Sequence, residues 1–104
     1  MPYFVFCAHD RPGTGEARAK VRERHRAYIR VAQDGCRCVA GGPLMEEGGA
    51  AMNGTLLIFE ARDRQAVERF VAGDPYWGED IFARSDIWQW NWGLGQPAEK
   101  ERSA

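Results

Sequence analysis

The sequence predicts an α+β domain in which one antiparallel sheet carries two helices on a single face. Three observations lead to this class. Apolar runs of strand-forming residues alternate with two stretches of helical periodicity, giving the order β-α-β-β-α-β. The chain has 104 residues, which suffices for one hydrophobic core and is too short for a second. Its formal net charge of -1 and its mixed composition are those of an ordinary globular domain.

The first strand and the first helix have clear sequence boundaries. Residues 3–8 are a continuous apolar run rich in strand formers, and the polar, turn-forming residues 9–13 close it. Helical periodicity then covers residues 15–34. Thr14 is placed to cap the first turn of this helix, and Gly35 is placed to end it.

The middle of the chain supplies two more strands. Residues 36–41 read as a short strand, which Gly42 and Pro43 are expected to break. Residues 44–53 contain glycine and show no periodicity, which is typical of a flexible connection. The third strand, residues 55–61, is the most hydrophobic segment of the sequence.

A second helix and a last strand complete the order. Asp63 is placed to cap the helix and Gly73 to end it, and a short turn follows over residues 75–82. Residues 85–92 then alternate with period two. In about 90 residues this order is most economically the ferredoxin-like arrangement, a four-stranded antiparallel sheet with both helices on one face. Ala66, Val67, Phe70 and Val71 are expected to face the sheet, and Trp88, Trp90 and Trp92 are expected to project from one face of the last strand.

The sheet face without helices also needs cover. Residues 3–8 and 55–61 are apolar at both alternating positions, and an exposed face of this extent exceeds the patch that a monomer tolerates. We therefore expect a homodimer with the sheets face to face, a dimeric α+β barrel. The tryptophan row either seals this dimer or lines a ligand cavity within it, and burial in the interface is the preferred interpretation. The predicted domain spans residues 1–92, and residues 93–104 are expected to form a flexible tail.

Composition and cysteine content argue against several classes of function. The 14 basic and 15 acidic side chains give no overall charge that would favour nucleic acid. The sequence shows no leader peptide and no apolar stretch near the roughly 20 residues that span a bilayer, so we expect a soluble, cytoplasmic protein that does not bind membranes. The odd number of cysteines is typical of reduced thiols, and Cys36 with Cys38 alone is a weak metal signal. We expect no metal and no organic cofactor, since no motif for either is present.

The first predicted helix and the turn before it are locally basic, with seven lysines or arginines against two glutamates. Lys20, Arg26 and Arg30, with Glu23, lie away from the apolar stripe of the helix, which is typical of a solvated face. Arg18, Arg22 and Arg24 lie nearer the margins of the stripe, where one of them could reach the mouth of a pocket and attract an anionic ligand. Of these, Arg22 is our candidate for substrate binding.

His25 falls inside the apolar stripe of this helix, where packing would ordinarily favour leucine or valine. At about 100° per residue it points in the same direction as Ala17, Val21 and Tyr28, so its imidazole is expected to face inward. A buried histidine most often satisfies a backbone carbonyl. With a carboxylate in reach, it is instead placed for proton transfer.

Asp74 is the carboxylate that we pair with His25. Because Asp74 precedes Pro75, its backbone is driven to an extended conformation and its side chain is free to cap the following turn, which is a purely structural use. If it also accepts the Nδ1 proton of His25, it fixes the tautomer and leaves Nε2 as a general base facing a cavity. We predict that His25 and Asp74 are catalytic.

Three further residues are candidates for substrate binding. His9 ends the first strand near the start of the first helix, and the neighbouring Asp10 is expected to form an Asx turn. Tyr76 and Trp77 follow the aspartate and would form an aromatic wall, although burial at the domain edge explains them equally well.

Several segments, taken in order and at their spacings, resemble the YCII-related family. The resemblance covers about residues 3–92 and implies a ferredoxin-like subunit, a dimer, and a site on the residues that correspond to His25 and Asp74. The chain is also similar to dehydrochlorinase members, which remove chloride from hydroxylated chloroaromatics. It departs from the usual pattern in its doubled glycine and its tryptophan-rich last strand. The matching segments are Ala8-His9-Asp10-Arg11-Pro12-Gly13, Arg22-Glu23-Arg24-His25, Ala40-Gly41-Gly42-Pro43-Leu44, Gly54-Thr55-Leu56-Leu57-Ile58-Phe59-Glu60 and Asp74-Pro75-Tyr76.

Two classes of function remain. The first is a lyase-like or isomerase-like enzyme that uses His25 and Asp74 without a cofactor on a small anionic or phenolic molecule. The second is a non-catalytic small-molecule-binding or accessory dimer in which both residues are structural. A cofactor-free oxygenase on the related dimeric barrel has only the aromatic residues in its favour.

Overall fold

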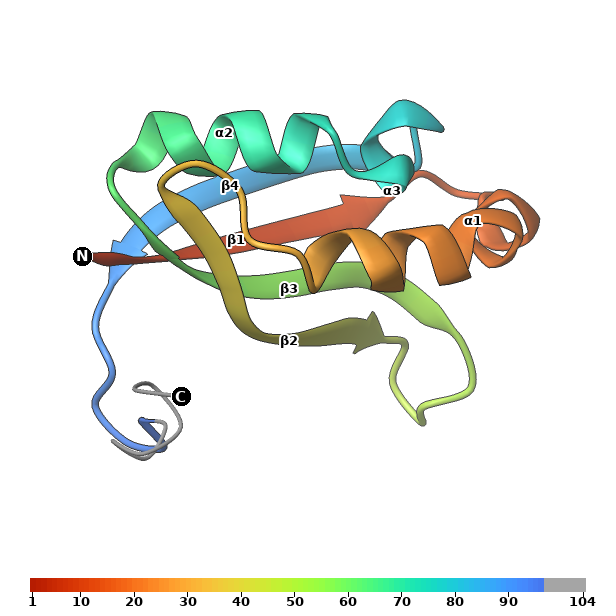
Figure 1. Ribbon diagram of the computed structural model, residues 1–104. Coiled ribbons are helices and arrows are strands. Elements are labelled where there is room, and N and C mark those ends of the chain that lie inside the picture. The colour runs from red at the N-terminus through yellow and green to blue at the C-terminus, as the bar shows by residue number, and fades with distance from the viewer. Residues whose placement is uncertain (97–104) are drawn as a thin grey trace.

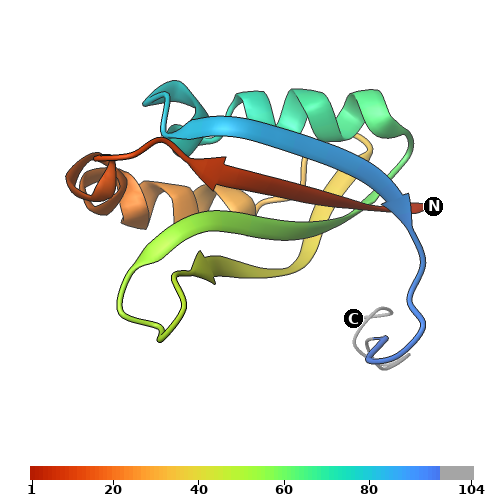
Figure 2. The same cartoon turned by 180° about the vertical axis from the view of Figure 1, so that it is seen from behind.

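The computed structural model describes residues 1–96 and has the predicted order of strands and helices, with one additional short helix. The four strands form one antiparallel sheet in the order β2-β3-β1-β4. Figures 1 and 2 show the helices on one face of this sheet and the other face bare. This is the ferredoxin-like arrangement. The elements are β1 (Tyr3–Asp10), α1 (Gly15–Ile29), β2 (Cys36–Met45), β3 (Met52–Ala61), α2 (Arg64–Ala72), α3 (Pro75–Gly78) and β4 (Phe82–Trp90).

The core lies between the sheet and the helices. Alternate residues of β1 point into it, so Phe4, Phe6 and Ala8 are buried while their neighbours on the bare face are only half-buried. The four residues of α2 that were predicted to face the sheet are all buried. The Asp63 carboxylate caps α2 as predicted, accepting a hydrogen bond from the Ala66 N–H at 2.8 Å.

The second strand is longer than its sequence suggested. β2 continues through Gly42 and Pro43 to Met45, and the connection shrinks to residues 46–51. The predicted break was wrong because β2 is an edge strand with β3 as its one neighbour, and an edge strand tolerates a residue that has no N–H to donate. β3 also begins earlier than predicted, at Met52.

Three other predicted boundaries are corrected. α1 ends at Ile29 rather than near residue 34, and Gly35, at φ +70°, lies in the turn before β2. The Thr14 side chain does not cap α1, because its hydroxyl donates to the Arg11 carbonyl at 2.8 Å. β4 spans Phe82–Trp90, and part of the predicted turn before it is helical as α3.

The bare face of the sheet is apolar in its middle. Tyr3, Val5 and Cys7 of β1 are half-buried there, and Trp88 of β4, which pairs with Val5, is 54% exposed. Trp90 and Trp92 contact each other edge to face with ring centroids 4.8 Å apart. Within residues 1–96, no helix is long and apolar enough to span a bilayer. Most of the predicted tail, from residue 97 on, lies outside the described residues.

Gly41 and Gly42 are expected to respond differently to alanine. A Cβ at Gly41 would lie 2.6 Å from Leu57 Cδ2 and 2.7 Å from the Leu56 backbone oxygen, whereas a Cβ at Gly42 would meet nothing within 4 Å. Gly41→Ala should therefore lower the free energy of unfolding by about 1–3 kcal/mol through overpacking. Gly42→Ala should leave it unchanged or raise it by less than about 1 kcal/mol. Urea denaturation of both variants measures the difference, and equal midpoints would contradict the close approach of β2 to β3.

Candidate active site

His25 and Asp74 lie in direct contact, although 49 residues separate them in the sequence. The His25 Nδ1 atom is 2.9 Å from Asp74 Oδ1 and 2.8 Å from Asp74 Oδ2, and both side chains are buried. α1 brings the histidine to this point because its apolar face packs toward the sheet. Asp74 arrives from the extended position that precedes Pro75 at the start of α3.

The Asp74 carboxylate also has the structural role that its sequence position suggested. Its Oδ1 atom accepts a hydrogen bond from the Tyr76 N–H at 2.9 Å, which caps α3. Because a carboxylate only accepts hydrogen bonds, the His25 Nδ1 atom carries the proton in this contact. The Nε2 atom makes no hydrogen bond within residues 1–96, so it is the nitrogen left free when the ring carries a single proton.

The ring of Tyr76 contacts both His25 and a second buried side chain, that of Arg18. Its ring stacks on the His25 ring, with centroids 3.9 Å apart and planes 12° apart. The Arg18 guanidinium carbon lies 4.5 Å from the centroid of the same Tyr76 ring. The orientation of the imidazole is thus set by the carboxylate at its edge and by an aromatic ring on its face.

Arg18 is a buried arginine with a full set of acceptors around its terminal nitrogens. Its Nη1 atom donates to both carboxylate oxygens of Asp10 at 3.1 Å, and its Nη2 atom donates to the Gly54 carbonyl at 2.9 Å and the Thr55 hydroxyl at 2.8 Å. The Asp10 carboxylate binds this guanidinium instead of forming the expected Asx turn. Burial raises the pKa of Asp10, and the Arg18 charge and hydrogen bonds offset only part of that effect.

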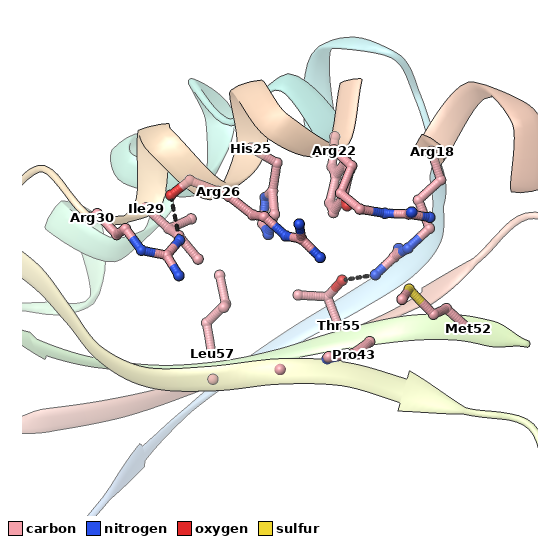
Figure 3. Close-up of a pocket in the computed structure, with 13 residues that line it drawn as sticks. Arg18, Arg22, His25, Arg26, Ile29, Arg30, Pro43, Met52, Thr55 and Leu57 are labelled. Atoms are coloured by element: carbon pink, nitrogen blue, oxygen red, sulfur yellow. Dashed lines mark hydrogen bonds between the residues drawn. The ribbon is translucent and has the colours of Figure 1, made fainter. Parts of the chain in front are cut away.

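A cavity of about 200 Å³ opens beside His25, between α1 and the strands β2 and β3. The side chains of Arg18, Arg22, Arg26 and Arg30 line this cavity, and Figure 3 shows them in the gap between α1 and the sheet. No carboxylate lines the cavity within residues 1–96. The charged or polar residues in its wall are Arg18, Arg22, His25, Arg26, Arg30, Thr55 and Tyr76, and the others are Ile29, Gly41, Gly42, Pro43, Met52 and Leu57.

The structure brings only some of the predicted binding residues to this cavity. Arg22 and Tyr76 line it together with His25. His9 does not, because it has the same parity as Tyr3, Val5 and Cys7 in β1 and so points to the bare face of the sheet. Trp77, 43% exposed, lines a separate hollow of about 220 Å³ beside β4. Arg24 is exposed on α1 and lies outside both hollows.

Sequence reasoning missed Arg26 and Arg30, which it assigned to a solvated face. Their backbone positions do lie off the apolar stripe, but their long side chains extend back over the glycine-containing segment of β2. The available signal was a spacing of four residues along α1 and its C-terminal capping residue, from Arg18 through Arg22 and Arg26 to Arg30.

The cysteines are thiols in apolar surroundings. Burial raises the pKa of Cys36 to about 12 and the pKa of Cys38 to about 11, so both are protonated at neutral pH. Within residues 1–96, no three metal-binding side chains of the histidine, cysteine or carboxylate type cluster together.

The family model of the YCII-related domain matches residues 1–91 of the chain. The chain belongs to the YCII-related family. An uncharacterised protein of Haemophilus influenzae is 33% identical to this YCII-related protein over 86 residues, which is 78% of this chain and 88% of the relative. Protein YciI of Escherichia coli O6:H1 is 26% identical over 89 residues, which is 81% of this chain and 91% of YciI.

One of the solved structures similar to this chain is that of an enzyme. TftG of Burkholderia phenoliruptrix AC1100 is a 5-chloro-2-hydroxyhydroquinone dehydrochlorinase, and its structure is a complex with 2,5-dihydroxybenzoquinone. It matches this YCII-related chain with a TM-score of 0.78 and 29% sequence identity, covering 88% of this chain and 95% of TftG. The two proteins therefore share one fold over most of their length.

Proposed function

We propose that this YCII-related protein is a cofactor-independent enzyme that uses His25 and Asp74 for acid–base chemistry on a small anionic or phenolic molecule. The observation that carries the proposal is the buried contact between His25 Nδ1 and the Asp74 carboxylate, at the wall of a cavity that holds no carboxylate of its own within residues 1–96. The likeness to TftG supports elimination as the reaction type.

The geometry supports a specific division of roles. Asp74 holds the proton on Nδ1, so Nε2 of His25 is free to take a proton from a bound ligand. In an elimination, the bonding pair of the broken C–H or O–H bond forms a new double bond. Chloride leaves with the bonding pair of the C–Cl bond, and the imidazolium then returns its proton to water. A positioned base of this kind contributes roughly 10²–10⁴-fold to the rate.

The test is the replacement of His25 by Gln, with chloride release from 5-chloro-2-hydroxyhydroquinone as the assay. Glutamine is polar and similar in length but is not a base, so the variant is expected to fold while its rate falls by about 10²–10⁴-fold. Thermal unfolding and ligand titration on the same samples separate lost chemistry from lost structure. Full activity in the variant would refute the acid–base role.

A second candidate function is a non-catalytic small-molecule-binding dimer. The same samples distinguish the two functions. If the wild-type protein binds the ligand without turning it over, and the Gln variant binds equally well, the site is a binding site and the histidine is structural.

We also propose that the protein forms a homodimer through the bare face of its sheet. Support comes from the half-buried apolar residues of β1 on this face and from Trp88, which is 54% exposed in the single chain. Two such faces in contact would remove this apolar surface from water.

Trp88→Asp is expected to dissociate the dimer, because it places a charge in the apolar interface. Gln89→Asp is the matched control, since Gln89 is exposed at the next position of β4 and points to the opposite face of the sheet. Sedimentation of both variants reports the mass in solution. A monomeric wild-type protein, or a dimer that survives Trp88→Asp, would contradict this interface.

A further inference from the structure

The cavity beside His25 carries positive charge that the described part of the protein does not balance. The charge of Arg18 is matched by the buried Asp10. Arg26 pairs with Glu23, whose side chain is 84% exposed, and Arg30 donates to the Arg26 backbone carbonyl. Neither Arg22 nor Arg30 has a carboxylate partner within residues 1–96.

Of the four arginines in the cavity wall, Arg22 is the one whose guanidinium makes no hydrogen bond within residues 1–96. Its Nε atom is buried without a partner, as is that of Arg18, but the terminal nitrogens of Arg18 are fully engaged, and most buried donors in proteins are satisfied. Arg22 lies between Arg18 and Arg26 in the cavity wall (Figure 3). A planar guanidinium with free donors matches the two oxygens of a carboxylate.

The size of the cavity limits what can accompany that carboxylate. A cavity of about 150 Å³ accommodates a benzene molecule. The volume of about 200 Å³ therefore suits one six-membered ring with a few substituents. Tyr76 and Leu57 supply apolar wall for the ring, and His25 lies in the same wall as Arg22, so a single-ring molecule can contact both.

We propose that the ligand class of this site is a monocyclic carboxylic acid, held by its carboxylate on Arg22 while its ring extends toward His25. This inference rests on the proposed function, which makes the cavity the site that binds a ring. The new element is the ligand's carboxylate, whose permanent negative charge is the feature that the site selects.

The experiment compares two rings that differ by one carboxylate, 2,5-dihydroxybenzoate and hydroquinone, by calorimetric titration of the full chain. The benzoate is expected to bind about 10–100-fold more tightly, which is the contribution of hydrogen bonds to a charged partner. Arg22→Gln should abolish this preference. Arg24→Gln, the same change at an exposed arginine outside the cavity, should keep it. The inference would be overturned if the wild-type protein bound the two rings with equal affinity. It would also be overturned if Arg22→Gln and Arg24→Gln lost the preference for the benzoate to the same extent.

Two further arms separate the possible failures. Inorganic phosphate tests for a general anion site, and phosphate binding as tightly as the benzoate would overturn the assignment to a ring-bearing acid. The titrations are repeated on His25→Gln. If that variant keeps its preference for the benzoate and the wild-type protein has no turnover, the proposed function fails and the ligand class stands. If the wild-type protein turns over neutral rings with no preference for the acid, the ligand class fails and the proposed function stands.

Discussion

Replacing Arg18 with Met is expected to lower the free energy of unfolding by roughly 3–5 kcal/mol at pH 7, because it breaks a buried ion pair from one side. The side chains of Arg18 and Asp10 are only 4% and 8% exposed. Methionine fills the space of the aliphatic stem but leaves the Asp10 carboxylate, the Gly54 carbonyl and the Thr55 hydroxyl without their donor. Chemical denaturation of the wild type and the variant measures the loss.

The size of this loss is expected to depend on pH. Burial raises the pKa of Asp10, and the neighbouring Arg18 lowers it by less. A carboxyl with a raised folded pKa contributes stability below its unfolded pKa of about 3.9, and this stability is lost as the pH rises through the folded pKa. Removing Arg18 raises the folded pKa further. The destabilisation should therefore shrink as the pH falls from 7 toward 4.

Two controls identify the ion pair as the cause. The double variant Asp10→Asn with Arg18→Met removes both charges and should recover at least about 1 kcal/mol relative to Arg18→Met alone. Arg26→Met breaks the ion pair with Glu23, whose members are 51% and 84% exposed, and should cost no more than about 0.5 kcal/mol. A loss in Arg18→Met that does not change with pH, or that the double variant does not relieve, would show that packing rather than charge explains it.

Hydrophobic patterning was enough to predict the fold. Continuous apolar runs marked β1 and β3, a period-two alternation marked β4, and the apolar stripe of α2 identified its four buried residues correctly. The boundaries that were wrong depend on tertiary context. β2 continues past Pro43 because this edge of the sheet needs no N–H there, and α1 stops at Ile29 although helix-compatible residues follow.

The contact of His25 with Asp74 could be anticipated because each residue carried a local signal. The histidine broke an apolar stripe, and the aspartate preceded a proline at a helix start. Arg18 carried no such signal. It lies at the margin of the stripe, and its burial depends on Asp10, Gly54 and Thr55, which reach it from other elements. Residues whose position is decided by partners distant in sequence are the ones that sequence patterns do not reveal.

Asp74→Asn is expected to reduce kcat by about 10²–10⁴-fold while leaving the fold intact, because it reverses the hydrogen bond to the histidine. In the native carboxylate, Oδ1 accepts from the Tyr76 N–H, which can only donate. The asparagine oxygen must therefore stay on Tyr76, and the amide NH₂ then faces His25 Nδ1. That nitrogen becomes an acceptor, the ring proton moves to Nε2, and Nε2 can no longer act as the base.

The tautomer itself is the readout that separates this account from simple loss of structure. Nitrogen chemical shifts of the His25 ring should show the proton on Nδ1 in the neutral wild type and on Nε2 in Asp74→Asn. Asp80→Asn is the matched control, since Asp80 is an exposed aspartate that pairs with Arg11 at the surface. Its positive φ of 55° is one that asparagine adopts readily. Wild-type turnover in Asp74→Asn with the proton moved to Nε2 would mean that His25 does not act as a base through that nitrogen, whatever its burial and its partner.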